Sequence, residues 1–221
     1  MPTALVPLAR SPRSERVKRR AIRALLGTTL RGAYRLRVRG MHHVPRRGPA
    51  VVVCNHVSFI DWLFVALALP RLPHFVMHQH HFRSAAFRWF FDLHHVIPIA
   101  PRKEDPARCD EAFEAIDRAL AAGELVMIFP EGTMTPDGEL SPIRPGVERI
   151  LARRPVPVVP LALRGLWGSF FSRDGGEPMQ KLPRRLRSSV EIVAGAPIPP
   201  GEVTTERLAS TLAALRGVAR R

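Results

Sequence analysis

Short apolar runs alternate with longer amphipathic segments along most of this chain, and this alternation constrains its fold more than any other feature. Residues 50–54 (AVVVC) and 124–130 (ELVMIFP) have the length and composition of buried strands. Residues 107–122 follow a helical period instead and end at Gly123. Strands that alternate with helices predict an α/β fold with a mostly parallel sheet flanked by helices. The other expected strands are residues 34–40, 74–78, 96–100, 156–163 and 189–195, and the other expected helices are residues 58–70, 84–95, 146–154 and 204–216.

A basic amphipathic helix is expected ahead of the sheet, over residues 14–33. Residues 1–40 contain eleven Lys or Arg and one acid, Glu15, and so hold most of the net charge of +15. Such a segment favours a polyanionic partner, either nucleic acid or anionic lipid. A general bias toward arginine is the alternative, since only three of the 34 basic residues are Lys. We therefore predict an N-terminal segment, residues 1–33, and one domain, residues 34–221.

Polar residues follow the first buried strand in the stretch "CNHVSFIDW". On one continuous helix, His56 and Asp61 would lie about 140° apart and could not meet. They can meet if His56 lies in the turn before the helix and Asp61 in its first turn. Asp61 would then orient the imidazole of a catalytic base, and free N–H groups at the helix N-terminus would stabilise negative charge. The structural alternative is a capping box, in which Ser58 caps the helix and Asp61 closes the box.

A second polar turn follows the buried strand at residues 124–130, in "FPEGTMTPDGEL". It carries Glu131, Gly132 and Thr133, at the strand end where open α/β sheets bind ligands. An ordinary polar turn between strand and loop is the alternative. The Pro- and Gly-rich residues 165–185 are the longest expected loop.

The blocks "NHVSFID", "FPEGT" and "VPVVPLAL", in this order and spacing, resemble those of the glycerolipid acyltransferases typified by 1-acylglycerol-3-phosphate acyltransferase. The resemblance covers roughly residues 30–200. Within the family, the chain is especially similar to the acyltransferase modules of bacterial lysophosphatidylethanolamine acyltransferases. The resemblance implies an O-acyltransferase domain over residues 34–221. The implied reaction moves a fatty acyl group from acyl-CoA or acyl carrier protein to the free hydroxyl of a lysophospholipid. 1-Acylglycerol-3-phosphate, giving phosphatidic acid, is the favoured acceptor, and another lysolipid such as lysophosphatidylethanolamine is the alternative.

The resemblance also implies roles for individual residues. His56 would take the proton of the acceptor hydroxyl, and Asp61 would support the imidazolium. Glu131, Gly132 and Thr133 would line the acceptor site, and Arg102, in "VIPIAPR", would contact phosphate. No permanently bound cofactor and no metal are implied.

Two positions depart from the family pattern. The family often has an arginine directly after E-G-T, where it can contact the acceptor phosphate, and this chain has Met134 there. The spacing before Arg102 is about one residue longer than usual. Both departures bear on which acceptor is used.

Two other site chemistries match parts of the sequence. Cys54 stands two residues before His56, which leaves a Cys–His hydrolase or a covalent acyl-cysteine open, although a buried structural thiol fits the strand better. Nine histidines suggest a metal site, yet no H-E-x-x-H pattern occurs and the two cysteines are isolated. Isolated cysteines fit a reducing compartment.

The charge alone would also fit a nucleic-acid-binding module. Such a module explains neither the apolar stripe among the arginines nor the two polar blocks, so we expect no nucleic-acid partner. The N-terminus lacks a signal peptide, and no apolar run approaches 18 residues. We expect a peripheral enzyme on the cytoplasmic face of the cell membrane. Its expected partners are the lysophospholipid, the acyl thioester, with acyl carrier protein as one donor, and an anionic membrane surface.

Overall fold

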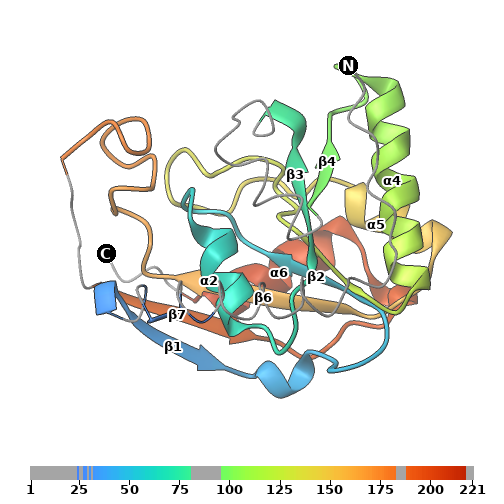
Figure 1. Cartoon of the computed structure of the whole chain (residues 1–221), viewed down its shortest axis with the longest axis horizontal. Coiled ribbons are helices and arrows are strands. Elements are labelled where there is room, and N and C mark those ends of the chain that lie inside the picture. Colours follow the sequence, from blue (N-terminus) through green and yellow to red (C-terminus); the bar gives the residue numbers. More distant parts are fainter. Residues whose placement is uncertain are drawn as a thin grey trace.

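A seven-stranded sheet forms the centre of the molecule (Figure 1). The computed structural model describes residues 32–80, 96–182 and 188–217, together with Ala24, Gly27, Thr28 and Leu30. The strand order is β1-β7-β6-β2-β5-β3-β4. The strands are β1 (Arg35–Arg39), β2 (Ala50–Cys54), β3 (His74–His78), β4 (Ile97–Ile99), β5 (Leu125–Ile128), β6 (Val158–Arg164) and β7 (Ser189–Ala194).

The sheet is mostly parallel, as the sequence predicts. β2 lies at its centre and pairs in parallel with both β5 and β6. Among the described strands, only β7 runs antiparallel to a neighbour, β6. Because β2 and β5 run the same way, the turns that follow them leave from one edge of the sheet. Those two turns carry both polar motifs found in the sequence.

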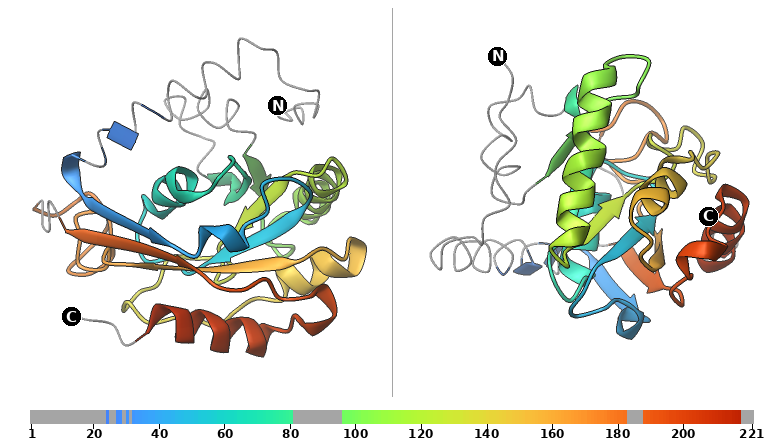
Figure 2. Two further views of the ribbon diagram at one scale, coloured as in Figure 1. Left: turned by 90° about the horizontal axis from the view of Figure 1, so that it is seen from below. Right: turned by 90° about the vertical axis from the view of Figure 1, so that its right-hand side faces the viewer.

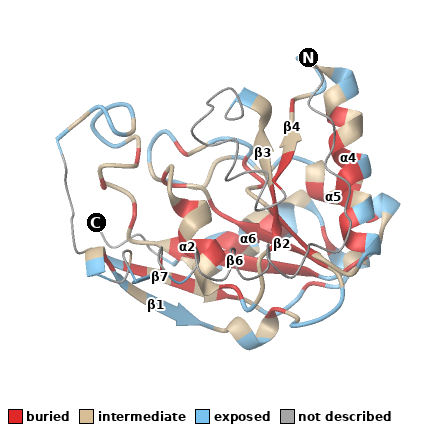
Figure 3. Ribbon diagram, in the orientation of Figure 1, coloured by how far each residue is buried: buried red, intermediate tan, exposed pale blue. Residues whose placement is uncertain are grey.

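Helices cover both faces of the sheet (Figure 2). Successive residues of a strand point to opposite faces, and every residue of β2 is buried. Val52 and Cys54 belong to the core on the side of α2 (Asp61–Ala68), whereas Val51 and Val53 belong to the core on the opposite side. That second core packs on α4 (Pro106–Ala121), α5 (Gly146–Arg153) and α6 (Thr205–Arg216). The red stretches of Figure 3 mark these two buried layers.

Capping residues set the ends of the longer helices. Asp105 accepts a hydrogen bond from the backbone N–H of Arg108 at 2.9 Å and caps α4, which continues with a proline at its first position. Thr204 caps α6 in the same way, through the N–H of Arg207 at 3.1 Å. Two 3-10 turns complete the described elements, η1 (Met41–His43) and η3 (Pro200–Glu202).

Some sequence-based predictions differ from the structure, and others fall on residues that it does not describe. The helix expected over residues 84–95 lies outside the described residues, and so does most of the basic helix expected over residues 14–33. The helix expected from Ser58 begins three residues later, at Asp61. Residues 165–182 form an irregular loop, as predicted. Within the described part of the chain, no helix combines the length and apolar character needed to cross a membrane.

Candidate active site

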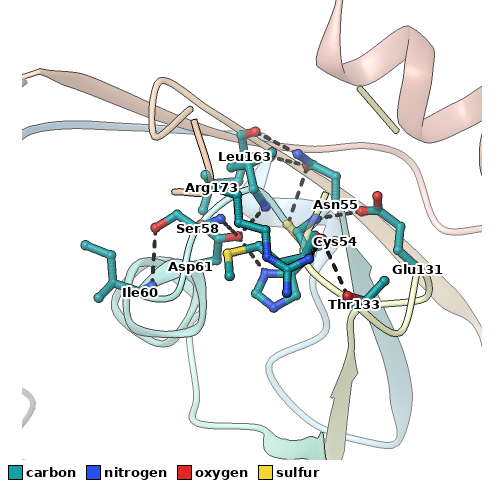
Figure 4. A network of polar contacts seen from close by, with 12 residues as sticks. Cys54, Asn55, Ser58, Ile60, Asp61, Glu131, Thr133, Leu163 and Arg173 are labelled. Carbon is teal, nitrogen blue, oxygen red and sulfur yellow. Dashed lines mark hydrogen bonds and ion pairs between the residues drawn. The ribbon is translucent and has the colours of Figure 1, made fainter. Parts of the chain in front are cut away.

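The two polar motifs meet at the carboxyl edge of β2 and β5. Val53 and Ile128 are register partners at the ends of these strands. The backbone N–H of His56 donates to Oε1 of Glu131 at 2.7 Å, and the His56 carbonyl accepts from the N–H of Thr135 at 2.9 Å. The turn after β2 and the turn after β5 are therefore bonded to each other directly (Figure 4).

His56 and Asp61 lie side by side, because His56 is in the turn and Asp61 opens α2. Nδ1 of His56 is 2.9 Å from Oδ2 of Asp61. The imidazole also stacks on the ring of Phe129, with centroids 4.1 Å apart. Because Nδ1 faces the carboxylate, Nε2 is the ring nitrogen available to a substrate. The spacing of the motif thus predicts the observed geometry.

The Asp61 carboxylate is fully buried, and its hydrogen bonds concentrate on one oxygen. Oδ2 accepts from the N–H groups of Val57 at 2.6 Å and Ser58 at 2.8 Å, besides facing His56. Burial raises the pKa of Asp61, and the contacts with His56, Ser58 and Val57 oppose that rise. The other oxygen, Oδ1, has no hydrogen-bond partner among the described residues. A buried carboxylate with an unused oxygen costs stability, which is typical of a functional group.

The capping-box alternative is present only in part. Asp61 does bond back to the N–H of Ser58, as the acidic member of a capping box would. The hydroxyl of Ser58, however, accepts from Ile60 at 3.3 Å, and Ile60 is the residue that precedes the helix. Ser58 therefore shapes the turn and does not cap α2.

The N–H groups just before α2 are occupied within the fold, so they are not the free donors predicted at the helix N-terminus. The N–H groups of residues 57–60 all have acceptors within the fold. The Asp61 carboxylate takes the first two, the carbonyl of Phe171 the third at 2.9 Å, and the hydroxyl of Ser58 the fourth. These donors serve to hold the turn that carries His56.

Glu131, Gly132 and Thr133 occupy distinct positions in the turn after β5. Glu131 is 2% exposed, and its second oxygen accepts from the N–H of Ser141 at 2.7 Å, so both carboxylate oxygens bind backbone. Burial raises the pKa of Glu131 against the pull of these N–H groups. Gly132 and Thr133 line the cavity described below. Their predicted contact with an acceptor stays a prediction.

Arg102 lies apart from these residues. It follows β4, its side chain is 61% exposed, and its guanidinium donates to Asp110 at 2.9 Å. It is not among the residues that line the cavity. The predicted phosphate contact of Arg102 stays a prediction. In the structure its guanidinium forms an ion pair with Asp110 of α4.

Asn55 holds the site to the sheet and has no role in the sequence-based hypothesis. Its buried side chain donates to the carbonyl of Leu163 at 3.0 Å and accepts from the N–H of Leu163 at 2.8 Å. Cys54 pairs with Leu161 in register, so this amide continues the β2–β6 ladder after the backbone of β2 has left it. The sequence signal for this role is a polar residue directly after a wholly apolar strand.

A cavity of about 890 Å³ opens beside His56. Its volume falls within the range of small-molecule sites, about 300–1,000 Å³. The His56 end is lined by Phe129 and Met134, and the wall formed by α4, α5 and the neighbouring strands is apolar. That apolar wall includes Val76, Ile99, Phe113, Ile116, Ile128 and Ile150. Such a lining suits an aliphatic chain whose reactive end lies at the imidazole.

Cys54 and the described histidines form no alternative centre. Cys54 is fully buried beneath the site, outside the cavity lining, and burial raises the pKa of its thiol well above the ordinary value. A thiol of raised pKa is a poor nucleophile at neutral pH. Within the residues described, no group of three or more His, Cys, Asp or Glu side chains could hold a metal ion.

Comparison with known proteins gives a consistent result. A family model described as Acyltransferase matches residues 35–164. A 1-acyl-sn-glycerol-3-phosphate acyltransferase of Brassica napus, BAT2, is 31% identical over 133 residues, which are 60% of this chain and 38% of that protein. The human 1-acyl-sn-glycerol-3-phosphate acyltransferase alpha is 30% identical over 129 residues, 58% of this chain and 45% of that protein. The chain thus spans less than half the length of these relatives.

A solved structure shares the fold. The crystal structure of PlsC from Thermotoga maritima, described as a 1-acyl-sn-glycerophosphate acyltransferase, superposes with a TM-score of 0.67. The match covers 92% of this chain and 82% of that one, at 16% sequence identity. At this identity the likeness concerns the fold, a mostly parallel sheet flanked by helices.

Proposed function

Since this chain belongs to the Acyltransferase family, we propose that it transfers a fatty acyl group from an acyl thioester to the free hydroxyl of a lysophospholipid. The observation that carries the proposal is the His56 imidazole, which bonds to a buried carboxylate through Nδ1 and lines an apolar cavity. The cavity matches an aliphatic substrate, and the His–Asp pair matches a proton transfer.

The proposed reaction needs no acyl group on the protein. Nε2 of His56 accepts the proton of the acceptor hydroxyl while the hydroxyl oxygen attacks the carbonyl carbon of the thioester. The tetrahedral intermediate collapses as the C–S bond breaks, and the imidazolium returns the proton to the departing thiolate. Asp61 holds the ring orientation and stabilises the imidazolium through the 2.9 Å contact. General-base assistance of this kind contributes about 10²–10⁴ in rate.

The favoured acceptor is 1-acylglycerol-3-phosphate, with phosphatidic acid as the product. Support comes from the relatives of about 30% identity, whose names state this activity. Acyl-CoA and acyl carrier protein are the two proposed donors. Purified protein is to be assayed with both donors against lysophosphatidic acid, lysophosphatidylethanolamine and lysophosphatidylcholine. Phosphatidic acid as the fastest product supports the proposal, and no transfer to any lysolipid from either donor refutes it.

The enzyme is proposed to work as a peripheral protein on the cytoplasmic face of the cell membrane. The sequence of residues 14–33 combines an apolar stripe with arginines, and each basic residue near an anionic surface contributes about 1 kcal/mol. Deleting residues 1–33 should reduce sedimentation with anionic liposomes and lower activity on membrane-presented lysolipid. Activity on a short-chain, water-soluble acceptor should survive. Unchanged liposome binding across a range of salt would show that this segment is not the anchor.

A further inference from the structure

The cavity beside His56 carries positive charge and no acid in its described lining. Arg144 and Arg173 both line it, whereas no Asp or Glu does. Arg173 contacts Met134, which occupies the position where the family often has an arginine. Nη1 of Arg173 donates to the carbonyl of Met134 at 3.3 Å. The Arg173 guanidinium, from the loop of residues 165–182, therefore lies beside the turn after β5, where Met134 stands in place of the usual arginine.

The loop that carries Arg173 is fixed to the catalytic turn. The carbonyl of Phe171 accepts the N–H of Phe59, three residues beyond His56. Ser172 is fully buried, and its hydroxyl bridges the N–H of Gly168 and the carbonyl of Ser169 at 3.1 and 3.0 Å. These bonds fix the backbone next to Arg173, and its side chain lines the cavity from there.

Arg144 lies against the same turn, where Gly132 leaves room for it. Gly132 has a φ of +70°, and a Cβ atom there would lie 2.8 Å from Cδ and Nε of Arg144. The backbone N–H of Arg144 donates to the carbonyl of Pro130 at 2.9 Å. Its guanidinium makes no ion pair with the described residues, and Nε of Arg173 has no hydrogen-bond partner among them. Arg144 thus has N–H donors available to a ligand, whereas Arg173 can offer only its Nη groups, because its Nε is buried.

We infer that Arg173 and Arg144 bind the phosphate group of the lysolipid acceptor, in place of the arginine that Met134 replaces. Guanidinium groups bind phosphate through paired, charge-assisted hydrogen bonds, and two of them suit a phosphate monoester. This inference rests on the proposed function and adds to it which residues recognise the head group. Acyl-CoA also carries phosphates, so the test must separate acceptor from donor.

The experiment measures KM for lysophosphatidic acid and for acyl-CoA in the wild type, Arg173→Gln and Arg144→Gln. Each substitution should raise KM for lysophosphatidic acid about ten- to a hundredfold, the loss expected for one hydrogen bond to a charged group, and leave KM for acyl-CoA unchanged. Arg173→Gln combined with Met134→Arg should restore acceptor binding. Arg118→Gln, an exposed charge on α4 paired with Glu114, is the control for net charge.

The outcomes separate this inference from the proposed function. Unchanged KM for lysophosphatidic acid in an active enzyme, or a rise in KM for acyl-CoA instead, would overturn the inference and leave the activity standing. A wild type that acylates no lysolipid would remove the proposed function itself. KM does not depend on the fraction of folded protein, so partial unfolding of a variant does not obscure the result. If Arg173→Gln fails to fold, Arg144→Gln decides, because its exposed side chain makes no ion pair with the described residues.

Discussion

The backbone N–H of His56 donates to the Glu131 carboxylate at 2.7 Å, across 75 residues of sequence. The other oxygen of Glu131 binds the N–H of Ser141, so one buried side chain holds the turn after β2 and the loop after β5 together. We therefore regard Glu131 as a positioning residue for His56, in addition to its predicted place at the acceptor site. A displacement of about 1 Å at a reacting group can cost 10²-fold in rate, which gives such a bond functional weight.

Glu131 should make stability depend on pH with a definite sign. Burial raises its pKa above the ordinary value of 4.5, so the folded state holds this proton more tightly than the unfolded chain. The resulting stabilisation is complete below pH 4.5 and is lost as pH rises through the folded pKa. The unfolding free energy of the wild type minus that of Glu131→Gln should therefore decrease over this window, measured by urea denaturation at a series of pH values. A difference that grows with pH would show that the folded protein favours the charged form.

Asp61→Asn should separate activity from stability. The amide keeps an oxygen for the N–H groups of Val57 and Ser58 but cannot support an imidazolium, so turnover should fall about 10²–10⁴-fold. The melting temperature should stay level or rise, because the variant removes a charge that burial disfavours. Kinetics and thermal unfolding of the same preparation check both. Normal turnover with a lowered melting temperature would assign Asp61 to helix capping alone.

Asn55→Ala should destabilise the protein by about 3 kcal/mol. It leaves the buried N–H and C=O of Leu163 without the partners that the amide supplies, and each unsatisfied group costs about 1–3 kcal/mol. Asn55→Asp should cost at least as much, because the buried carboxylate keeps an acceptor for the Leu163 N–H but places an unpaired charge against the Leu163 carbonyl. Urea unfolding of both variants measures the difference. Equal stability of Asn55→Ala and the wild type would mean that Leu163 finds other partners and that the amide is not a structural bridge.

Local patterns were sufficient to predict the described strands and the meeting of His56 with Asp61. Short apolar runs rich in β-branched residues, such as β2, favour buried strands, and a strand end followed by a helix start fixes where residues five positions apart can approach. The helix start itself was placed three residues early, because Ser58 uses its hydroxyl within the turn. Propensity alone does not distinguish a residue that caps a helix from one that shapes the turn before it.

Long-range contacts were beyond the sequence pattern. The sequence gives no sign that both Glu131 oxygens bind backbone, which follows from the register of β2 with β5 bringing the His56 N–H to it. The free N–H groups expected before α2 are occupied, one of them by Phe171 from a loop more than 100 residues away. The approach of Arg173 to Met134 depends on the same loop. Such contacts follow from the packing of separate segments and have no periodic signature.

The rate of acyl transfer in His56→Ala tests the central claim most directly. Wild type and variant are compared at equal folded protein, judged by circular dichroism, with acyl-CoA and lysophosphatidic acid as substrates and phosphatidic acid measured by mass spectrometry. Removing the base should lower the rate about 10²–10⁴-fold while the fold persists, since the side chain lies at the cavity, where it stacks on Phe129 and bonds to Asp61. Transfer by His56→Ala at the wild-type rate would contradict the assignment of His56 as the base.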